Sequence, residues 1–259
     1  MRWNNNELFI LRKFYTDKGD VYISKLINRT PNVIRIRAHM LKIKRVEKDI
    51  KLSSDEDQII LGSLLGDMYC GIHHTCKNAH IEEAHSKKQF SYLYWKLEKL
   101  SSLTFNLRKT KIGALHFDSR VHPILNSYYR LFYKDGKKTV NRDILDKLDA
   151  LGIAVWYMDD GSYPKNSYSC TLHTNGFSHE ENVLIKQWFE EKWDICPKIT
   201  SFLKGIKRYY FLRFPAKESR KLIELIKPYI HQSMQYKTGN IFETKSETKR
   251  RNVLWEIDL

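Results

Sequence analysis

Two short apolar segments that end on acidic residues constrain the fold more than any other feature of this sequence. The first covers residues 60–67 (Ile-Leu-Gly-Ser-Leu-Leu-Gly-Asp), and the second covers residues 153–160 (Ile-Ala-Val-Trp-Tyr-Met-Asp-Asp). Their terminal carboxylates, Asp67 and Asp160, lie 93 positions apart. Each segment precedes the same order of predicted strands and helices, so from about residue 55 onward the chain contains one module in two copies.

Each copy is predicted to run helix, two strands, helix, two strands, helix. In the first copy these elements are helix 55–66, strands 68–75 and 79–85, helix 87–103, strands 104–110 and 113–118, and helices 121–133 and 142–149. In the second copy they are helix 150–160, strands 163–167 and 168–175, helix 179–192, strands 197–203 and 206–214, and helix 216–228. The apolar face expected on helix 87–103 consists of Phe90, Leu93, Tyr94, Leu97 and Leu100. We therefore predict an α+β fold with two αββαββα repeats, at 56–149 and 150–259, related by a pseudo-twofold axis.

The first helix of each copy is predicted to pack against its counterpart. Gly62 and Gly66 lie four residues apart on one face. Because glycine destabilises a helix interior by roughly 0.5–1 kcal/mol, two at this spacing indicate a need for close packing.

Packing of these helices would place Asp67 and Asp160 together at helix C-termini, where negative charge is unfavourable. A divalent cation resolves this repulsion. The two carboxylates, with the backbone carbonyls of Gly66 and Asp159, form an oxygen donor set that suits Mg²⁺ or Mn²⁺. The alternative, that each aspartate only ends its helix, is less favoured because the acids occur in matching positions.

The first 45 residues are predicted to form three short helices, followed by a basic linker at 46–55. The third helix has the clearest start signal, with Thr30 as N-cap and Pro31 at the first helical position. Its polar face carries Asn32, Arg35 and His39. This arrangement is typical of a helix-turn-helix domain whose last helix enters the major groove of DNA, and the helix resembles the third helix of Myb-like domains. The alternative is a small helical bundle packed on the main domain.

The charge of the chain indicates a polyanionic partner. Its 45 Lys and Arg residues outnumber its 30 Asp and Glu residues, which gives a formal net charge of +15. Such a surplus favours nucleic acid, although a soluble basic protein without this partner is the alternative. No apolar stretch reaches the roughly 18 residues needed to span a bilayer. We expect no membrane partner and an intracellular location, cytoplasmic for a bacterial or phage protein, with an organelle as the alternative.

The two acidic segments resemble the paired motifs of a LAGLIDADG homing endonuclease of the single-chain, two-motif type. Residues 61–67 match the first motif and residues 154–161 match the second. Met68 replaces the final glycine of the first motif, and Val155 stands where the family often has a small residue. The resemblance implies that Asp67 and Asp160 are catalytic metal ligands.

Two lysines also match the family pattern. Lys138 lies 71 residues after Asp67, and Lys237 lies 77 residues after Asp160. The resemblance implies that both lysines lie near the cleavage centre, where they polarise water or stabilise the charged phosphorane. The alternative is that they are ordinary surface lysines.

The resemblance implies a sequence-specific, divalent-metal-dependent DNA endonuclease that takes part in intron mobility. Such an enzyme would make staggered cuts with short 3′ overhangs in a long, asymmetric double-stranded site. Both motifs lie in one chain, so we expect a monomer. The alternative function is a non-cleaving nucleic-acid-binding protein of the same fold, either an intron RNA maturase or a transcription regulator.

Overall fold

The chain folds into two compact units, Met1–Asp49 and Ile50–Leu259. The computed structural model describes residues 2–44, 49–111, 113–164 and 167–239. Residues 46–48 of the predicted linker at 46–55 therefore lie outside the described residues, and residues 49–53 are in neither a helix nor a strand. Its last two residues, Ser54 and Asp55, already belong to the first helix of the second unit.

The N-terminal unit contains helices α1 (Asn5–Ser24) and α2 (Pro31–Met40). Gly19 has a φ of 76° and interrupts α1, so the unit has three helical segments, as the sequence predicts. The first segment continues to Lys18 instead of ending near Phe14. Among the described residues of this unit, the buried apolar side chains are Leu11, Tyr15, Ile23, Ile27, Ile34 and Ala38.

The second unit contains both copies of the predicted module. The first copy consists of α3 (Ser54–Leu65), β1 (Tyr69–Gly71), β2 (His80–His85), the 3-10 helix η1 (Lys87–Gln89), α4 (Phe90–Lys99), β3 (Phe105–Lys109), β4 (Leu115–Ser119), α5 (Leu125–Phe132), β5 (Tyr133–Lys134), β6 (Lys137–Lys138) and α6 (Arg142–Lys147). The second copy consists of α7 (Ala150–Asp160), β7 (Gly161–Ser162), β8 (Cys170–Leu172), α8 (His179–Trp193), β9 (Lys198–Lys204), β10 (Lys207–Phe214), α9 (Ala216–Ile226), η2 (Lys227–Tyr229) and η3 (Gln232–Lys237).

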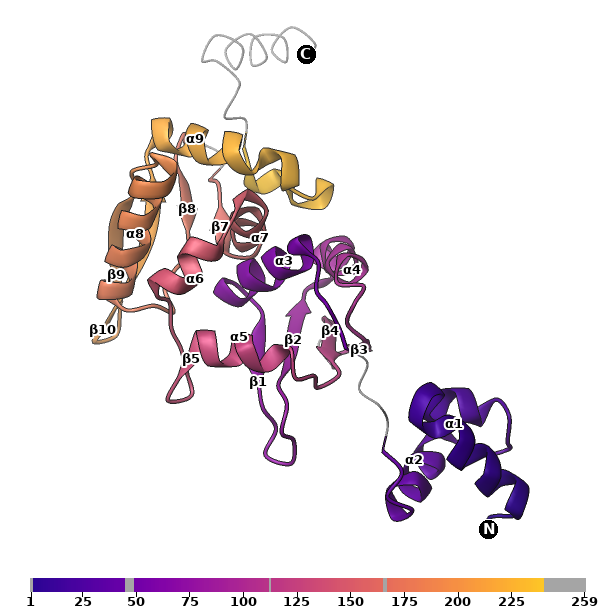
Figure 1. The fold of residues 1–259 in the computed structure, drawn as a ribbon. Coiled ribbons are helices and arrows are strands. Elements are labelled where there is room, and N and C mark those ends of the chain that lie inside the picture. Colours follow the sequence, from indigo (N-terminus) through magenta and orange to yellow (C-terminus); the bar gives the residue numbers. More distant parts are fainter. Residues whose placement is uncertain (1, 45–48, 112, 165–166, 240–259) are drawn as a thin grey trace, which may run out of the picture. The chain divides into compact units, whose positions relative to one another are not determined.

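The two four-stranded sheets have the same antiparallel order, β1-β2-β4-β3 in repeat 1 and β7-β8-β10-β9 in repeat 2. Helices α3 and α7 lie side by side where the two repeats meet, and helices cover one face of each sheet (Figure 1). One continuous core of buried apolar side chains runs through both repeats. The predicted α+β fold with a duplicated module is confirmed.

Several predicted elements differ from the structure; strand 68–75, for example, is limited to β1 at Tyr69–Gly71. Strand 163–167 is wrong: β7 occupies Gly161–Ser162, directly after α7, and Pro164 lacks the N–H group that a ladder requires. Strand 168–175 shortens to β8. Helix 87–103 ends at Lys99, because the Ser102 backbone N–H leaves the helix and donates to Glu56 Oε1 at 2.7 Å.

The short hairpin of β5 and β6 was absent from the prediction. Asp135 and Gly136 form its turn with φ values of 51° and 73°. An Asp-Gly pair is a strong signal for a two-residue hairpin turn, so this element was visible in the sequence. The described part of the chain holds no helix of the length and apolar character that membrane crossing requires.

Candidate active site at the ends of two helices

Helices α3 and α7 touch through their backbones. A Cβ atom added at Gly62 would lie 2.2 Å from the carbonyl oxygen of Gly152 and 3.0 Å from Val155 Cβ. No side chain fits in that space, so the glycine is required by the approach of the two helices. The bulk of Val155 on one helix fills the place left by Gly62 on the other.

Gln58 of α3 fastens the beginning of α7. Its Nε2 donates to the carbonyl of Lys147 at 2.8 Å, and its Oε1 accepts from the N–H of Asp149 at 2.8 Å. Asp149 in turn caps α7 by accepting from the N–H of Gly152 at 3.0 Å. These hydrogen bonds set the position of α3 relative to α7 along the helix axes. The sequence pattern did not predict them.

The two helix ends are similar in position but differ in detail. Helix α3 ends at Leu65, so Asp67 lies in the following turn and is exposed. Helix α7 continues through Asp160, whose side chain is half-buried. Burial, and then the carboxylates of Asp67 and Asp159, raise the pKa of Asp160 to about 7. Met68, which replaces a motif glycine, is fully buried in the core of repeat 1.

Each helix end holds one lysine. The Lys138 ammonium donates to the carbonyls of Gly66 at 3.2 Å and Met68 at 2.8 Å. The Lys237 ammonium donates to the carbonyls of Met158 at 2.6 Å and Asp159 at 2.8 Å. Burial lowers the pKa of both lysines, and the nearby aspartates oppose that shift. The structure therefore brings these lysines to matching positions beside the acids.

The Asp159 side chain turns away from repeat 2 and enters repeat 1. Its carboxylate accepts from Lys96 Nζ at 2.8 and 2.9 Å and from the Tyr92 hydroxyl at 2.9 Å. The counterpart of Asp159 in the first motif is Gly66, where an added Cβ would lie 2.6 Å from Asp159 Cβ. The first motif therefore has no side chain that could make the reciprocal contact.

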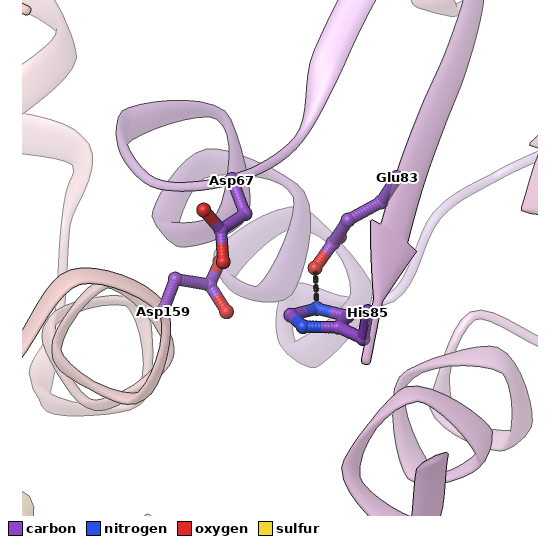
Figure 2. Close-up of side chains that lie close together, drawn as sticks. All are labelled: Asp67, Glu83, His85 and Asp159. Atoms are coloured by element: carbon purple, nitrogen blue, oxygen red, sulfur yellow. Dashed lines mark hydrogen bonds and ion pairs between the residues drawn. The ribbon is translucent and has the colours of Figure 1, made fainter. Parts of the chain in front are cut away.

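The Asp159 carboxylate belongs to a compact group of four possible metal ligands. One ligand atom from each of Asp67, Glu83, His85 and Asp159 lies within 4.8 Å of all the others. Figure 2 shows the Asp67 and Asp159 carboxylates next to each other, with Glu83 and His85 bonded together on β2. Lys96 Nζ also donates to Glu83 Oε1 at 2.6 Å. We call Asp67, Glu83, His85 and Asp159 the inner cluster.

Sequence reasoning missed Lys96 and Glu83, although a signal for the lysine existed. Lys96 lies three residues after Leu93 and four before Leu100, at core spacing on an otherwise apolar face. Lys96 is fully buried there, whereas Tyr94, which the periodicity placed inside, is 50% exposed. A lysine at a core position of a helix indicates a buried partner of opposite charge.

A hollow of about 430 Å³ opens beside Asp160. Its lining includes Lys138, His173 and Gly66. The His173 ring lies 2.9 Å from the Ser162 hydroxyl through Nε2, and its backbone N–H donates to the Asp160 carbonyl at 3.0 Å. Burial, and then Lys237, lower the pKa of His173.

The donor set at the helix ends fits a hard divalent cation. Asp67 and Asp160 supply carboxylate oxygens, the ligands that Mg²⁺ and Mn²⁺ prefer. The carbonyls of Gly66 and Asp159 already accept from lysines. Because a carbonyl oxygen has two lone pairs, each can still accept a second partner.

The three predicted DNA contacts of the N-terminal unit differ in their environment. Asn32 and His39 are exposed on α2, on the face opposite Ile34 and Ala38. Arg35 donates from Nε and Nη2 to Asp20 Oδ2 at 3.0 and 2.6 Å, but its side chain is still 60% exposed. Thr30 is the N-cap residue, as predicted, without a capping bond from its side chain.

Comparison with known proteins assigns the second unit to a family. The model of the LAGLIDADG DNA endonuclease family matches residues 57–222. The chain is 35% identical over 132 residues to the probable intron-encoded DNA endonuclease 3 of Mycosarcoma maydis, which covers 49% of this chain and 94% of that protein. It is 30% identical over 200 residues to protein RecA of Mycolicibacterium flavescens, covering 72% of this chain and 47% of that protein. The chain thus spans about half the length of the RecA relatives that it matches.

Among solved structures, the chain is similar to the homing endonuclease I-WcaI bound to its DNA recognition sequence. The TM-score is 0.65, and the match covers 83% of this chain and 96% of that chain. The sequences are 23% identical, so this likeness concerns the fold.

Proposed function

The chain belongs to the LAGLIDADG DNA endonuclease family, and from this premise we propose that it is a homing endonuclease that cuts double-stranded DNA with a divalent metal ion. The proposed target is a long, asymmetric sequence, cut on both strands with a short 3′ stagger. One chain supplies both motifs, so the active protein is a monomer with internal pseudo-twofold symmetry.

The observation that carries this proposal is the matched pair of acid and lysine at each helix end. Lys138 binds the carbonyls of Gly66 and Met68, the residues on either side of Asp67 in the chain. Lys237 binds the carbonyls of Met158 and Asp159, directly before Asp160. Two equivalent sets of groups suit two equivalent reactions, one on each strand of a duplex.

The residues of each set have distinct roles in the proposed reaction. The carboxylates of Asp67 and Asp160, with the carbonyls of Gly66 and Asp159, hold the cation. When bound, Mg²⁺ or Mn²⁺ supplies Lewis acidity to the scissile phosphate and to water. Lys138 and Lys237 place positive charge where the phosphorane gains negative charge. Backbone carbonyls at the helix ends already accept hydrogen bonds from both ammonium groups. The two lysine side chains therefore need little further ordering when DNA binds.

The exposed faces of the two sheets provide the surface for DNA. In β10, Leu212 and Phe214 point into the core, so Lys207 and Arg213 lie on the opposite face. The strand register places Lys204 beside Lys207 and Lys198 beside Arg213 on that face. Residues Asn106 and Arg108 of β3 and His116 and Asp118 of β4 share the corresponding face of repeat 1. These groups can pair with phosphates and base edges.

The N-terminal unit would extend the footprint on DNA as a helix-turn-helix domain. Asn32 and His39 are free to reach bases, and Arg35 keeps most of its side chain accessible while it pairs with Asp20. Separate binding assays with Asn32→Ala and His39→Ala test this role. A loss of affinity limited to longer DNA substrates supports it, and unchanged affinity on every substrate contradicts it.

The acids provide the direct test of the enzyme. We expect Asp67→Asn and Asp160→Asn each to abolish double-strand cleavage in Mg²⁺ while binding of the target is retained. The target is first found by cleavage of a randomised DNA library. Asp143→Asn, the same chemical change at an exposed site on α6, is the control. Full double-strand cleavage by either active-site variant would show that the assignment is wrong.

The alternative is a maturase or transcription regulator of the same fold. Such a protein keeps basic surfaces but has no need for paired acids and lysines at the helix ends, so the presence of all four favours cleavage. If the wild-type chain binds an intron RNA or a duplex with high affinity and never cuts the library, the alternative replaces the enzyme.

A further inference from the structure

The inner cluster already holds a cation, the ammonium group of Lys96. Lys96 Nζ lies 2.6 Å from Glu83 Oε1, 2.8 Å from Asp159 Oδ1 and 2.9 Å from Asp159 Oδ2. The side chains of all three residues are fully buried. Burial alone would lower the pKa of Lys96, but Asp159 and Glu83 outweigh it and raise the pKa, so the ammonium stays charged.

The ligands around this ammonium group would suit a transition metal. Three carboxylates and one imidazole, with ligand atoms within 4.8 Å of one another, are a donor set that binds Mn²⁺ well. One carboxylate oxygen, Glu83 Oε2, is buried and accepts no hydrogen bond from the described part of the chain. The cluster therefore has more acceptor capacity than Lys96 uses.

The same place in repeat 2 lacks this chemistry. The motif aspartates align Tyr69 with Ser162, and Tyr69 pairs with Glu82 as Ser162 pairs with Thr171. Glu83 and His85 thus correspond to Leu172 and Thr174. The residues that α8 buries are Asn182, Ile185, Trp188 and Phe189, none of which is charged. Glu83, His85 and Lys96 therefore have no charged equivalents in repeat 2, whose sheet has the same strand order without them.

We propose that Lys96 takes the place of a metal ion in the inner cluster and so keeps Asp67 available, on its exposed side, for the cation at the helix ends. Without the ammonium group, Asp67, Glu83 and Asp159 would together bind a divalent cation inside repeat 1. Lys96 is thus a positioning residue that acts through Asp159 and Asp67. The inference rests on the proposed function only in the role that it gives to Asp67. Metal binding to the inner cluster does not depend on DNA cleavage.

The test counts metal ions on the DNA-free full-length chain. Lys96→Met keeps the length and apolar character of the side chain but removes its charge. We expect this variant to bind one more Mn²⁺ ion per chain than the wild type, measured from the loss of the free Mn²⁺ signal in electron paramagnetic resonance. Adding Glu83→Gln should return the count to the wild-type value. Lys99→Met, the same change at an exposed position of α4, is the matched control and should leave the count unchanged.

Folding is followed by thermal melting, because a buried cluster without its counter-ion is unstable. We expect Mn²⁺ to raise the melting temperature of Lys96→Met by more than that of the wild type, since the ion binds the folded state. The proposal is overturned if Lys96→Met binds no additional Mn²⁺, or if it stays unfolded in excess Mn²⁺. Cleavage by the wild type tests the proposed function separately, so the two ideas can fail independently.

Discussion

Repeats 1 and 2 share their strand order but differ in what they bury and in what they expose. Repeat 1 buries Glu83, His85 and Lys96, whereas the residues of repeat 2 that correspond to Glu83 and His85 are Leu172 and Thr174. The exposed face of β9 and β10 in repeat 2 carries a set of basic and aromatic side chains, Lys198, Phe202, Lys204, Lys207, Tyr209, Phe211 and Arg213.

The corresponding face of repeat 1 is less basic. Glu82 and Asp118 pair across β2 and β4, and His116 and Arg108 pair across β4 and β3. The backbone of a duplicated module is thus conserved more closely than its chemistry. Two unlike surfaces suit the two halves of the asymmetric DNA site that we propose.

The largest expected effect is the loss of cleavage rate when either lysine of the proposed site is replaced. Lys138→Met and Lys237→Met should each slow cleavage by about 10²–10³-fold, the usual loss when one charge-stabilising group is removed from a transition state. Strand-specific labelling of the target measures nicking of each strand. If each lysine serves one strand, each variant will accumulate a nick on the other strand. Equal slowing of both strands by both variants would contradict a separate lysine for each strand.

The next effect concerns the contact between the helices. Gly62→Ala should lower the free energy of unfolding by about 2 kcal/mol, because the new Cβ would meet a carbonyl oxygen that cannot move away freely. Chemical denaturation measures this change. Gly176→Ala is the control, since a Cβ there has open space. A Gly62→Ala variant as stable as the wild type would show that the helices can separate without cost.

A second effect on stability, of similar size, should depend on pH. The pKa of Asp160 in the folded chain, about 7, lies above its ordinary value of 3.8. The folded state therefore holds this proton more tightly than the unfolded state, and the resulting stability is lost as the pH rises from about 4 through 7.

In metal-free buffer, Asp160→Asn should be more stable than the wild type at pH 8, by on the order of 2 kcal/mol, and should match it near pH 4. Denaturation at both pH values measures the difference, and Asp143→Asn shows the effect of the amide alone. A constant difference across pH would mean that burial of Asp160 does not govern its proton.

The smallest expected effect is a difference between the two sheet faces in how strongly DNA binding depends on salt. Replacing Lys204 and Lys207 with Gln should reduce the slope of log K against log salt by about 2, because each lost phosphate contact contributes roughly 0.9. Replacing Glu82 and Asp118 with Gln and Asn should leave that slope unchanged and alter base preference instead. Filter binding at several salt concentrations measures the slopes. An equal change in slope for both pairs of substitutions would contradict the idea that the sheet of repeat 2 makes the phosphate contacts and the sheet of repeat 1 influences base preference.

The sequence was sufficient to predict most of the fold, because two copies of one pattern support each other. Helix 150–160 matches α7 residue for residue, and the turn between 203 and 206 contains Gly205 with a φ of 62° as an αL glycine. The strand at Gly161–Ser162 was misplaced since a two-residue strand carries no periodicity.

The candidate site could be predicted only at residues that belong to a recognisable sequence pattern. Asp67 and Asp160 end the two motifs, Lys138 and Lys237 match the family pattern, and the structure places all four at the ends of the two helices. Asp159 was predicted to use only its carbonyl, but its side chain binds Lys96 and Tyr92. That contact joins residues 63 and 67 positions apart, and no local pattern records such a pairing.

The pairing of Gly66 with Asp159 has a consequence for how this protein can evolve. Gly66 leaves the room that Asp159 fills, and repeat 1 alone supplies the Lys96 that receives it. Two copies of repeat 2 would set two aspartates against each other with no lysine between them. Two copies of repeat 1 would leave both lysines without a carboxylate from the opposite helix. Neither half would keep this contact in a homodimer of itself, so the two repeats can change at these positions only together.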